Sequence, residues 1–108
     1  MLRRITLAAA GFLTLAGRAY AAEGFDAGAC AFNGLPLQGA VQVVDSFPDI
    51  RVQVVESFPD LNVELVESFA DRCGRWKLVD SFADIKIQYV NSFPDLKIRF
   101  VSSFPGVP

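Results

Sequence analysis

The sequence predicts an all-β domain: a compact, repeat-built fold of short strands, with no significant helix in the mature domain. The first observation is one phrase repeated six times between Val41 and Pro105: a short apolar stretch, a polar residue, then Ser-Phe-Pro-Asp or a near relative. The second is that apolar residues in each stretch recur at every other position, which is the period of a β-strand and not of a helix. The repeats are spaced by 11, 11, 13, 11 and 11 residues between their serines, which are Ser46, Ser57, Ser68, Ser81, Ser92 and Ser103.

The first 21 residues are typical of a secretory signal peptide. Arg3 and Arg4 precede an apolar run over residues 5–15, which is too short to span a bilayer, and the segment ends in Ala-Tyr-Ala at Ala21. We expect cleavage after Ala21, with Ala22 as the nearby alternative. The arginine pair also permits a twin-arginine signal, although such pairs are ordinary in general secretory signals. The sequence therefore predicts a periplasmic or secreted protein.

The charge of the mature protein argues against some partners. Removing residues 1–21 takes away three of the ten basic residues and none of the twelve acidic ones, which leaves a net charge of −5. A mildly acidic domain has no electrostatic reason to bind nucleic acid. The mature sequence has no further apolar segment long enough for a transmembrane helix.

The two cysteines, Cys30 and Cys73, are expected to form a disulfide, because they are the only pair and export would place them in an oxidising compartment. Closing a loop of that length would stabilise the fold by about 4 kcal/mol in the chain-entropy model. A metal site is the weaker interpretation, because two thiols are too few ligands and the sequence contains no histidine. We therefore expect neither a metal nor another cofactor.

The mature chain begins with a segment that shows no periodicity, and we interpret residues 22–29 as a mobile leader. Residues 30–108 then form a single domain. Asn33 and Gly34 lie between two short apolar pieces, which predicts a β-hairpin with a two-residue turn. Pro36 cannot donate a ladder hydrogen bond, so the second piece is expected at a sheet edge.

The repeats align on their serines and predict one buried face per strand. An apolar residue two before each serine breaks the alternation, which implies a bulge or bend. The pattern leaves the topology open between a meander and a paired winding. The alternating positions, seven, five and three residues before the serine, are Ile50, Val52 and Val54; Leu61, Val63 and Leu65; Ile85, Ile87 and Tyr89; and Leu96, Ile98 and Phe100. The interrupting residues are Val44, Val55, Val66, Val79, Val90 and Val101.

The Ser-Phe-Pro-Asp segments are expected to form the corners between strands. Ser and Asp side chains can bond nearby backbone groups, while Pro pre-sets φ and ends a strand. Ala70 and Ala83 replace the proline in two repeats, so the ring is useful but not indispensable. The phenylalanine of each corner is expected to be a buried apolar plug, contributing roughly 2–3 kcal/mol by its area. These residues are Phe47, Phe58, Phe69, Phe82, Phe93 and Phe104.

The fourth repeat differs from the others. Two extra residues lie between Asp71 and Trp76, and this segment also carries Cys73. Trp76 stands five before Ser81, at a position expected to face the core. The longer corner divides the array into two halves, and a disulfide would tie it to the N-terminal hairpin.

The repeated phrase, the N-terminal motif, the long corner and the chain end together closely resemble the septoil knot domain family of small bacterial proteins. The resemblance implies a monomeric, knotted all-β fold whose backbone forms a seven-crossing torus knot. It implies no established biochemical function. The similar segments are residues 43–50, 54–61, 90–96 and 101–105, Cys30 with residues 32–37, residues 73–77 and residues 102–108.

Catalysis is not expected from these residues. Without histidine, neither a Ser-His-Asp nor a Cys-His arrangement is possible. A serine that recurs in every corner is explained by turn geometry. Paired carboxylates, such as Asp45 with Asp49 or Asp80 with Asp84, offer a cation site in principle, but their spacing lacks the oxygen ligands of known calcium loops.

The charges predict basic strand faces bounded by acidic rims. The leading functional hypothesis is a highly stable, non-enzymatic exported protein with a structural or interaction role. The alternative is an envelope ligand-binding module that uses the basic faces to bind an anionic partner. The basic residues are Arg51, Arg75, Lys77, Lys86, Lys97 and Arg99, and the corner acids are Asp45, Asp49, Glu56, Asp60, Glu67, Asp71, Asp80, Asp84 and Asp95.

Overall fold

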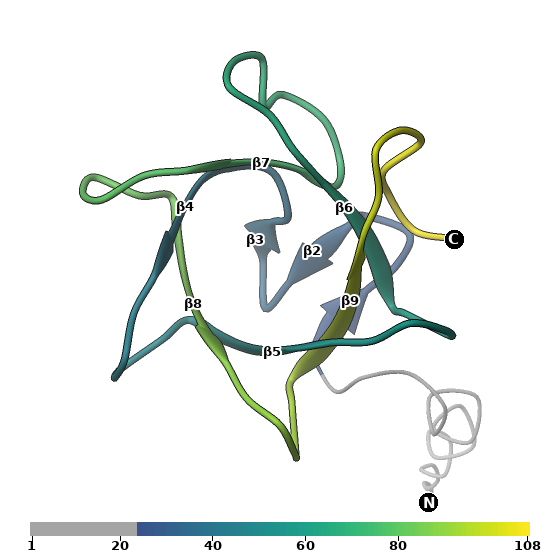
Figure 1. The fold of residues 1–108 in the computed structure, drawn as a ribbon, viewed down its shortest axis with the longest axis horizontal. Coiled ribbons are helices and arrows are strands. Elements are labelled where there is room, and N and C mark those ends of the chain that lie inside the picture. Colours follow the sequence, from purple (N-terminus) through teal and green to yellow (C-terminus); the bar gives the residue numbers. More distant parts are fainter. Residues whose placement is uncertain (1–23) are drawn as a thin grey trace, which may run out of the picture.

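The computed structural model describes residues 24–108, whose regular structure is entirely β-strand (Figure 1), so the all-β prediction is confirmed. The signal peptide expected over residues 1–21 lies outside the described residues. Residues 24–108 contain no helix that is long and apolar enough to cross a bilayer. The strands are β1 (Phe25–Asp26), β2 (Ala31–Phe32), β3 (Leu35–Pro36), β4 (Gly39–Val43), β5 (Ile50–Val54), β6 (Leu61–Leu65), β7 (Arg75–Leu78), β8 (Ile85–Tyr89) and β9 (Leu96–Phe100).

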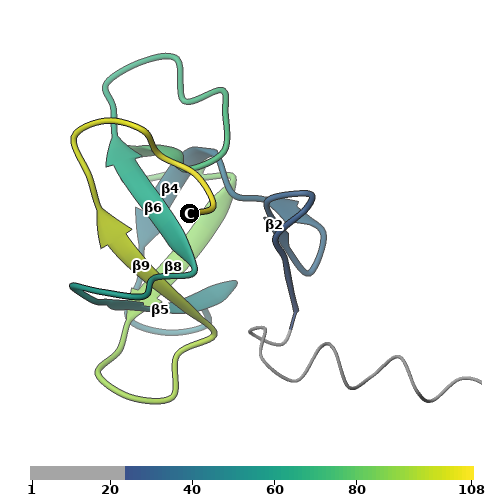
Figure 2. The same ribbon diagram turned by 90° about the vertical axis from the view of Figure 1, so that its right-hand side faces the viewer.

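Six of these strands form a closed barrel in the order β4-β7-β6-β9-β5-β8. Every neighbouring pair in the barrel is parallel, so all six strands begin at one end of the barrel and finish at the other. The remaining strands, β1 to β3, form a small antiparallel sheet. Figure 2 shows this sheet beyond the end of the barrel where the strands begin.

The predicted hairpin is confirmed. Phe32 of β2 pairs with Leu35 of β3, and the intervening Asn33 and Gly34 have φ angles of 48° and 87°. Two consecutive positive φ angles define the tight turn that Asn-Gly favours. Pro36 lies in β3, which is an edge strand, so its missing N–H leaves no gap in the ladder.

Regular structure begins earlier than the sequence analysis predicted. The interpretation of residues 22–29 as a mobile leader is wrong from Phe25 onward, because β1 pairs with β2 and Phe25 packs against the core. A turn connects the two strands, and in it the Ala29 N–H donates to Oδ1 of Asp26 at 3.1 Å. A two-residue strand has no detectable period, which is why the pattern did not reveal it.

The barrel interior is filled by the apolar residues that stand seven and five before the serines, and the repeats of β4 and β7 have glycine at the first of these positions. Trp76 is among them and is fully buried, as predicted. The third predicted position, three before the serine, is only half buried, with exposures of 39–47%. It lies at the end where the strands finish, opposite the N-terminal sheet. The barrel core comprises Val41, Ile50, Val52, Leu61, Val63, Trp76, Ile85, Ile87, Leu96 and Ile98, joined by Phe32 and Leu37.

Each short corner passes over the outside of one barrel strand. The corner at residues 44–49 connects β4 to β5, which lie on opposite sides of β8. Ile87 of β8 therefore pairs with Val43 on one side and with Ile50 on the other. Figure 1 shows the corners projecting outward around the ring. A strand crossed in this way is enclosed between the barrel core and a loop of the chain.

The same crossing recurs at four other corners. Residues 55–60 cross β9, residues 79–84 cross β4, residues 90–95 cross β5 and residues 101–106 cross β6. The strand ends just before the apolar residue that stands two before each of these serines, and the backbone N–H of that residue still bonds the crossed strand. These bonds run from Val44 to Ile87, Val55 to Ile98, Val79 to Val41, Val90 to Val52 and Val101 to Val63, each at 2.8–2.9 Å.

The order of the strands shows how the chain winds. A corner that crosses one strand moves the chain two strand positions around the barrel. The strands β4, β5 and β6 therefore occupy every second position and together make the first turn around it. The long corner, residues 66–74, advances the chain by only one place, because β6 and β7 are neighbours. That single step puts β7, β8 and β9 in the gaps of the first turn. The chain thus forms a paired winding, and the irregular fourth repeat is what interleaves the two turns.

The expectation that the six corner phenylalanines are buried plugs is wrong. Their exposures range from 77% at Phe69 to 98% at Phe82. The corner crosses outside a barrel whose interior is already filled, so no core space remains for a further ring. The corner rings therefore add nothing to the core, and the contribution to stability expected from their burial does not apply.

We predict opposite effects of two substitutions at one crossing. Ile98→Ala removes a fully buried side chain and should lower the free energy of unfolding by about 2–5 kcal/mol. Phe58→Asn, in the corner above it, removes an exposed ring and should leave that energy unchanged or raise it by up to about 1 kcal/mol, because Asn tolerates a positive φ better. Denaturant unfolding measures both. A loss of 2 kcal/mol or more in Phe58→Asn would restore the buried-plug interpretation.

Candidate interaction surface

The six corners share one unusual backbone conformation at their phenylalanines. Left-handed φ angles are uncommon for residues other than glycine, and for a bulky side chain they are outliers. Such a residue costs about 1–2 kcal/mol relative to an ordinary conformation. The angles are 53° at Phe47, 54° at Phe58, 59° at Phe69, 56° at Phe82, 51° at Phe93 and 58° at Phe104.

The aspartate that ends a short corner fixes it to the crossed strand. In the corner over β8, the Asp49 N–H donates to the Lys86 carbonyl, and the Lys86 N–H donates to Oδ2 of Asp49, both at 2.8 Å. The carboxylate thereby satisfies a backbone donor at the point where β8 changes partner. The pattern recurs for Asp60 with Lys97, Asp84 with Ala40 and Asp95 with Arg51.

A side chain of the crossed strand holds the other side of the corner. The amide of Gln88 on β8 donates to the Asp45 carbonyl at 2.8 Å, and Gln42 and Gln53 make the equivalent bonds to the Asp80 and Asn91 carbonyls. On β9 the longer Arg99 replaces glutamine and reaches the Glu56 carbonyl at 3.4 Å. Each of these bonds fixes the backbone just before the Ser-Phe pair.

The last corner ends in Gly106 instead of aspartate. Gly106 and Asn62 of β6 exchange two backbone hydrogen bonds, at 2.8 and 2.9 Å, in an antiparallel bridge. The bridge satisfies the same backbone donor that a carboxylate satisfies elsewhere. Gly106 has a φ of 120°, which disfavours any residue with a side chain. The departure from the repeat therefore preserves the attachment of the corner.

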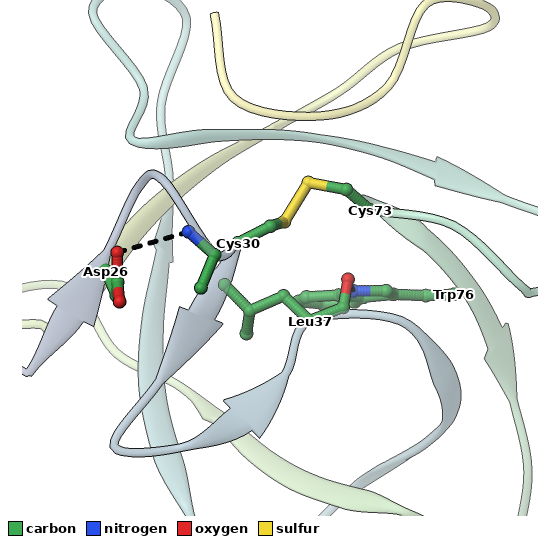
Figure 3. The surroundings of a disulfide bond; sticks show 6 residues. Asp26, Cys30, Leu37, Cys73 and Trp76 are labelled. Atoms are coloured by element: carbon green, nitrogen blue, oxygen red, sulfur yellow. Dashed lines mark hydrogen bonds between the residues drawn. A yellow bond between two sulfur atoms is a disulfide. The ribbon is translucent and has the colours of Figure 1, made fainter.

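The long corner is joined to the N-terminal sheet by the disulfide between Cys30 and Cys73, which confirms the predicted pair. Figure 3 shows Leu37 and Trp76 beside this bridge. The Trp76 indole N–H donates to the Leu37 carbonyl at 3.2 Å, which satisfies the only polar atom of a fully buried ring. Gly74 follows with a φ of 85°, and a Cβ there would lie 2.5 Å from the Asn62 carbonyl oxygen.

The predicted arrangement of basic faces bounded by acidic rims needs correction. Three basic residues, Lys86, Arg51 and Lys97, do lie on the adjacent strands β8, β5 and β9, and all three are exposed. Each, however, is bonded through its backbone to the carboxylate of a corner aspartate. The acids therefore interrupt the basic face. On β7, Arg75 approaches Glu64 at 3.6 Å and Asp71 at 3.9 Å.

The carboxylate pairs considered as cation sites are used differently. Asp49 and Asp84 bond backbone N–H groups, whereas the side chains of Asp45 and Asp80 point to no recorded partner within residues 24–108. That part of the chain contains no cluster of three potential metal ligands. Burial raises the pKa of the Tyr89 hydroxyl above its usual value.

At least two hollows lie on the surface formed by residues 24–108. The larger, about 520 Å³, lies between the N-terminal sheet and the barrel. The smaller, about 250 Å³, lies at the finishing ends of β4 and β7 and is lined by Gln42, Val43, Leu78, Val79 and Asp80. The larger is lined by Leu35, Pro36, Gln38, Gly39, Ala70, Asp71, Asp84 and Ile85.

The sequence pattern correctly predicted where the corners lie, but not the surroundings of their phenylalanine and aspartate side chains. The exposed rings were expected inside, and the partners of the corner aspartates lie 37 or 44 residues away instead of nearby. Nothing within an 11-residue repeat identifies such a partner. The recurrence of Asp three residues after five of the six serines was the available signal that this position has a structural role.

The interlocked parallel barrel defines a class of fold in which two turns of one chain enclose each other's strands. A family model described as the 7(1) septoil knot domain matches residues 34–108. The chain belongs to this family, and the resemblance stated from its sequence is confirmed.

A curated protein is also similar to part of this chain. It is described as "Uncharacterized protein slr1025" of Synechocystis sp. (strain ATCC 27184 / PCC 6803 / Kazusa), and it is 66% identical over 56 residues. The matched segment is 52% of this chain and 50% of the relative, so the match spans about half the length of that curated relative. Its description names no function.

We predict that the aspartate at the end of a corner stabilises the fold and that the acid at the beginning of the same corner does not. Asp49→Ala leaves the Lys86 N–H without its acceptor and should lower the free energy of unfolding by about 1–2 kcal/mol. Asp45→Ala, in the same corner, removes a carboxylate without a recorded bond and should change that energy by less than about 0.5 kcal/mol. Chemical denaturation tests the pair, and equal effects of the two substitutions would contradict the assigned role.

Proposed function

We propose that this chain is an exported, non-enzymatic protein with a structural or interaction role, whose interlocked barrel acts as a rigid, slowly unfolding scaffold. The carrying observation is the crossing of barrel strands by corners. Ile87, for example, is paired with Val43 before the corner and with Ile50 after it. β8 therefore cannot leave the barrel while the corner above it stays in place.

Slow unfolding follows from the way these crossings depend on one another. Each turn of the chain encloses strands of the other turn, so releasing one strand requires disrupting the corner that crosses it. Interactions that must break together raise the barrier to unfolding. Resistance to proteases is then set by the rate of unfolding as well as by the free energy of unfolding.

The disulfide supports the same role. Cys30 and Cys73 are separated by 43 residues, and closing that loop stabilises the folded state by about 4 kcal/mol in the chain-entropy model. It ties the N-terminal sheet to the corner that interleaves the two turns. A structural disulfide of this kind favours an oxidising compartment, which supports export.

A non-enzymatic role is supported by what the side chains do. The sequence contains no histidine, and Asp49, Asp60, Asp84 and Asp95 are engaged in attaching corners. The alternative, a module that binds an anionic partner through basic strand faces, is less favoured. Its Lys86, Arg51 and Lys97 alternate with those carboxylates, which reduces the positive potential.

The test is digestion of the full oxidised chain with a broad-specificity protease. We predict that a fragment beginning between residues 24 and 30 and ending at residue 108 persists long after the preceding residues are removed, because the barrel opens slowly. Mass spectrometry of the time course identifies the fragment. Rapid cleavage within the barrel strands would contradict the proposal.

A matched variant separates the crossings from the disulfide. Cys30→Ser combined with Cys73→Ser should speed cleavage in the N-terminal sheet while residues 39–108 still persist. If the double variant is digested as fast as an unfolded chain, the disulfide alone carries the resistance, and the proposed role of the crossings is lost.

A further inference from the structure

Two sets of apolar side chains are accessible on the barrel: an inner set at the end where the strands finish, and an outer set on the corners that project around the ring (Figure 1). The inner set stands three residues before each serine and is 39–47% exposed. The outer set is the six corner phenylalanines, 77–98% exposed. Rings of this size present on the order of 1,000 Å² of apolar surface in total, distributed over the six corners. The inner set is Val43, Val54, Leu65, Leu78, Tyr89 and Phe100.

The folded chain gains little from the outer rings. They contact no core, and their left-handed backbone would be less strained with Asn or Gly. An unfavourable conformation repeated at six exposed aromatic residues points to a task outside folding. Aromatic side chains are the residues that most often anchor protein interfaces.

Acidic side chains accompany these rings. Four of the six phenylalanines follow an exposed acid by two residues, and these acids are Asp45, Glu56, Glu67 and Asp80. Within the described residues their carboxylates make no recorded hydrogen bond or ion pair. The backbone carbonyls of three of them are fixed by a side chain of the crossed strand. The acids are thus held in place but electrostatically unpaired.

One hollow shows what such a combination can accept. The 250 Å³ hollow at the ends of β4 and β7 has walls from Val43, Leu78 and Val79, with Asp80 at its edge. Lysine and arginine have an apolar stem and a cationic head, so the stem fits against the walls while the head pairs with the carboxylate.

We propose that this end of the barrel, with its corners, docks a cationic, apolar protein segment in which lysine or arginine alternates with large apolar residues. This inference rests on the interaction role proposed above and names the chemistry of the partner. Charge complementarity selects this occupant. A second copy docked by the same face would bring like-charged acids together, and an anionic bilayer would be repelled by them.

The probe is a synthetic amphipathic peptide of leucine and lysine, titrated calorimetrically into the full oxidised chain. Two control peptides replace lysine by glutamate or leucine by serine. We expect the leucine–lysine peptide to bind at least tenfold more tightly than either control, with affinity falling as salt is raised. Equal binding of the glutamate peptide would overturn the proposal, because it would show unselective apolar adhesion.

Two sets of variants locate the site. Replacing Phe47, Phe58 and Phe82 together by Asn should weaken peptide binding at least tenfold without lowering the midpoint of denaturant unfolding. Asp80→Asn should weaken it severalfold, whereas the matched Asp26→Asn, which removes the same charge from β1 at the other end, should not. Unchanged affinity in the phenylalanine variant would overturn the proposal.

The other occupants are outcomes of the same study. Reversible dimerisation in sedimentation, abolished by the phenylalanine variant, would assign the face to a second copy. Binding to phosphatidylcholine vesicles, with no preference among the peptides, would assign it to a bilayer. Either result overturns the proposed partner, while a protease-resistant barrel would still support the scaffold role. Rapid digestion of the barrel would instead remove the scaffold role, whatever the peptide result.

Discussion

The fold depends on a single repeated constraint: one residue of a barrel strand is paired on both sides by consecutive strands of the same passing chain. At β8 this residue is Ile87, held between Val43 and Ile50. The side chain points into the core and is fully buried, while the corner passes over the outside. Burial and enclosure thus act on the same residue in β4, β5, β8 and β9, where an apolar residue stands five positions before the serine of the repeat.

The repeat is best understood as a set of attachments between two turns of chain. The apolar side chains fill the barrel. The glutamine side chain of the crossed strand donates a hydrogen bond to the beginning of the corner, and the aspartate at the end of the corner accepts one from the backbone of that strand. Each attachment joins segments 37–44 residues apart, so the repeat specifies long-range pairing and not merely local turns. Two departures from the pattern lie at the long corner, which advances the chain by one strand, and at Gly106, which attaches the last corner through its backbone.

The sequence predicted the parts of this structure that follow from local chemistry. The period-two pattern identified the barrel strands, and the Asn33-Gly34 turn and the burial of Trp76 were predicted from position alone. Parallel pairing could not be read from the repeats, because neighbours in the barrel come from different turns. The phenylalanines were misplaced for a related reason: hydrophobicity indicates a preference for burial, but the closed barrel had no volume left for them.

Membership of the septoil knot domain family places these attachments in a knotted chain. In that context the exposed phenylalanines are informative, because the scaffold beneath them is held independently of their rings. A rigid framework can display strained apolar residues that a looser fold would bury by rearranging. The interaction role proposed for the chain therefore follows from the same crossings that make the barrel difficult to open.

The most direct measurement of the central claim is residue-resolved amide hydrogen exchange of the folded chain. The amides of Arg51, Lys86 and Lys97 lie beneath crossing corners and donate to corner aspartates. The account predicts that they exchange only through global unfolding, at rates matching the most protected core amides. Exchange of these amides by independent local opening, well before the core amides, would show that the corners do not enclose the strands and would contradict it.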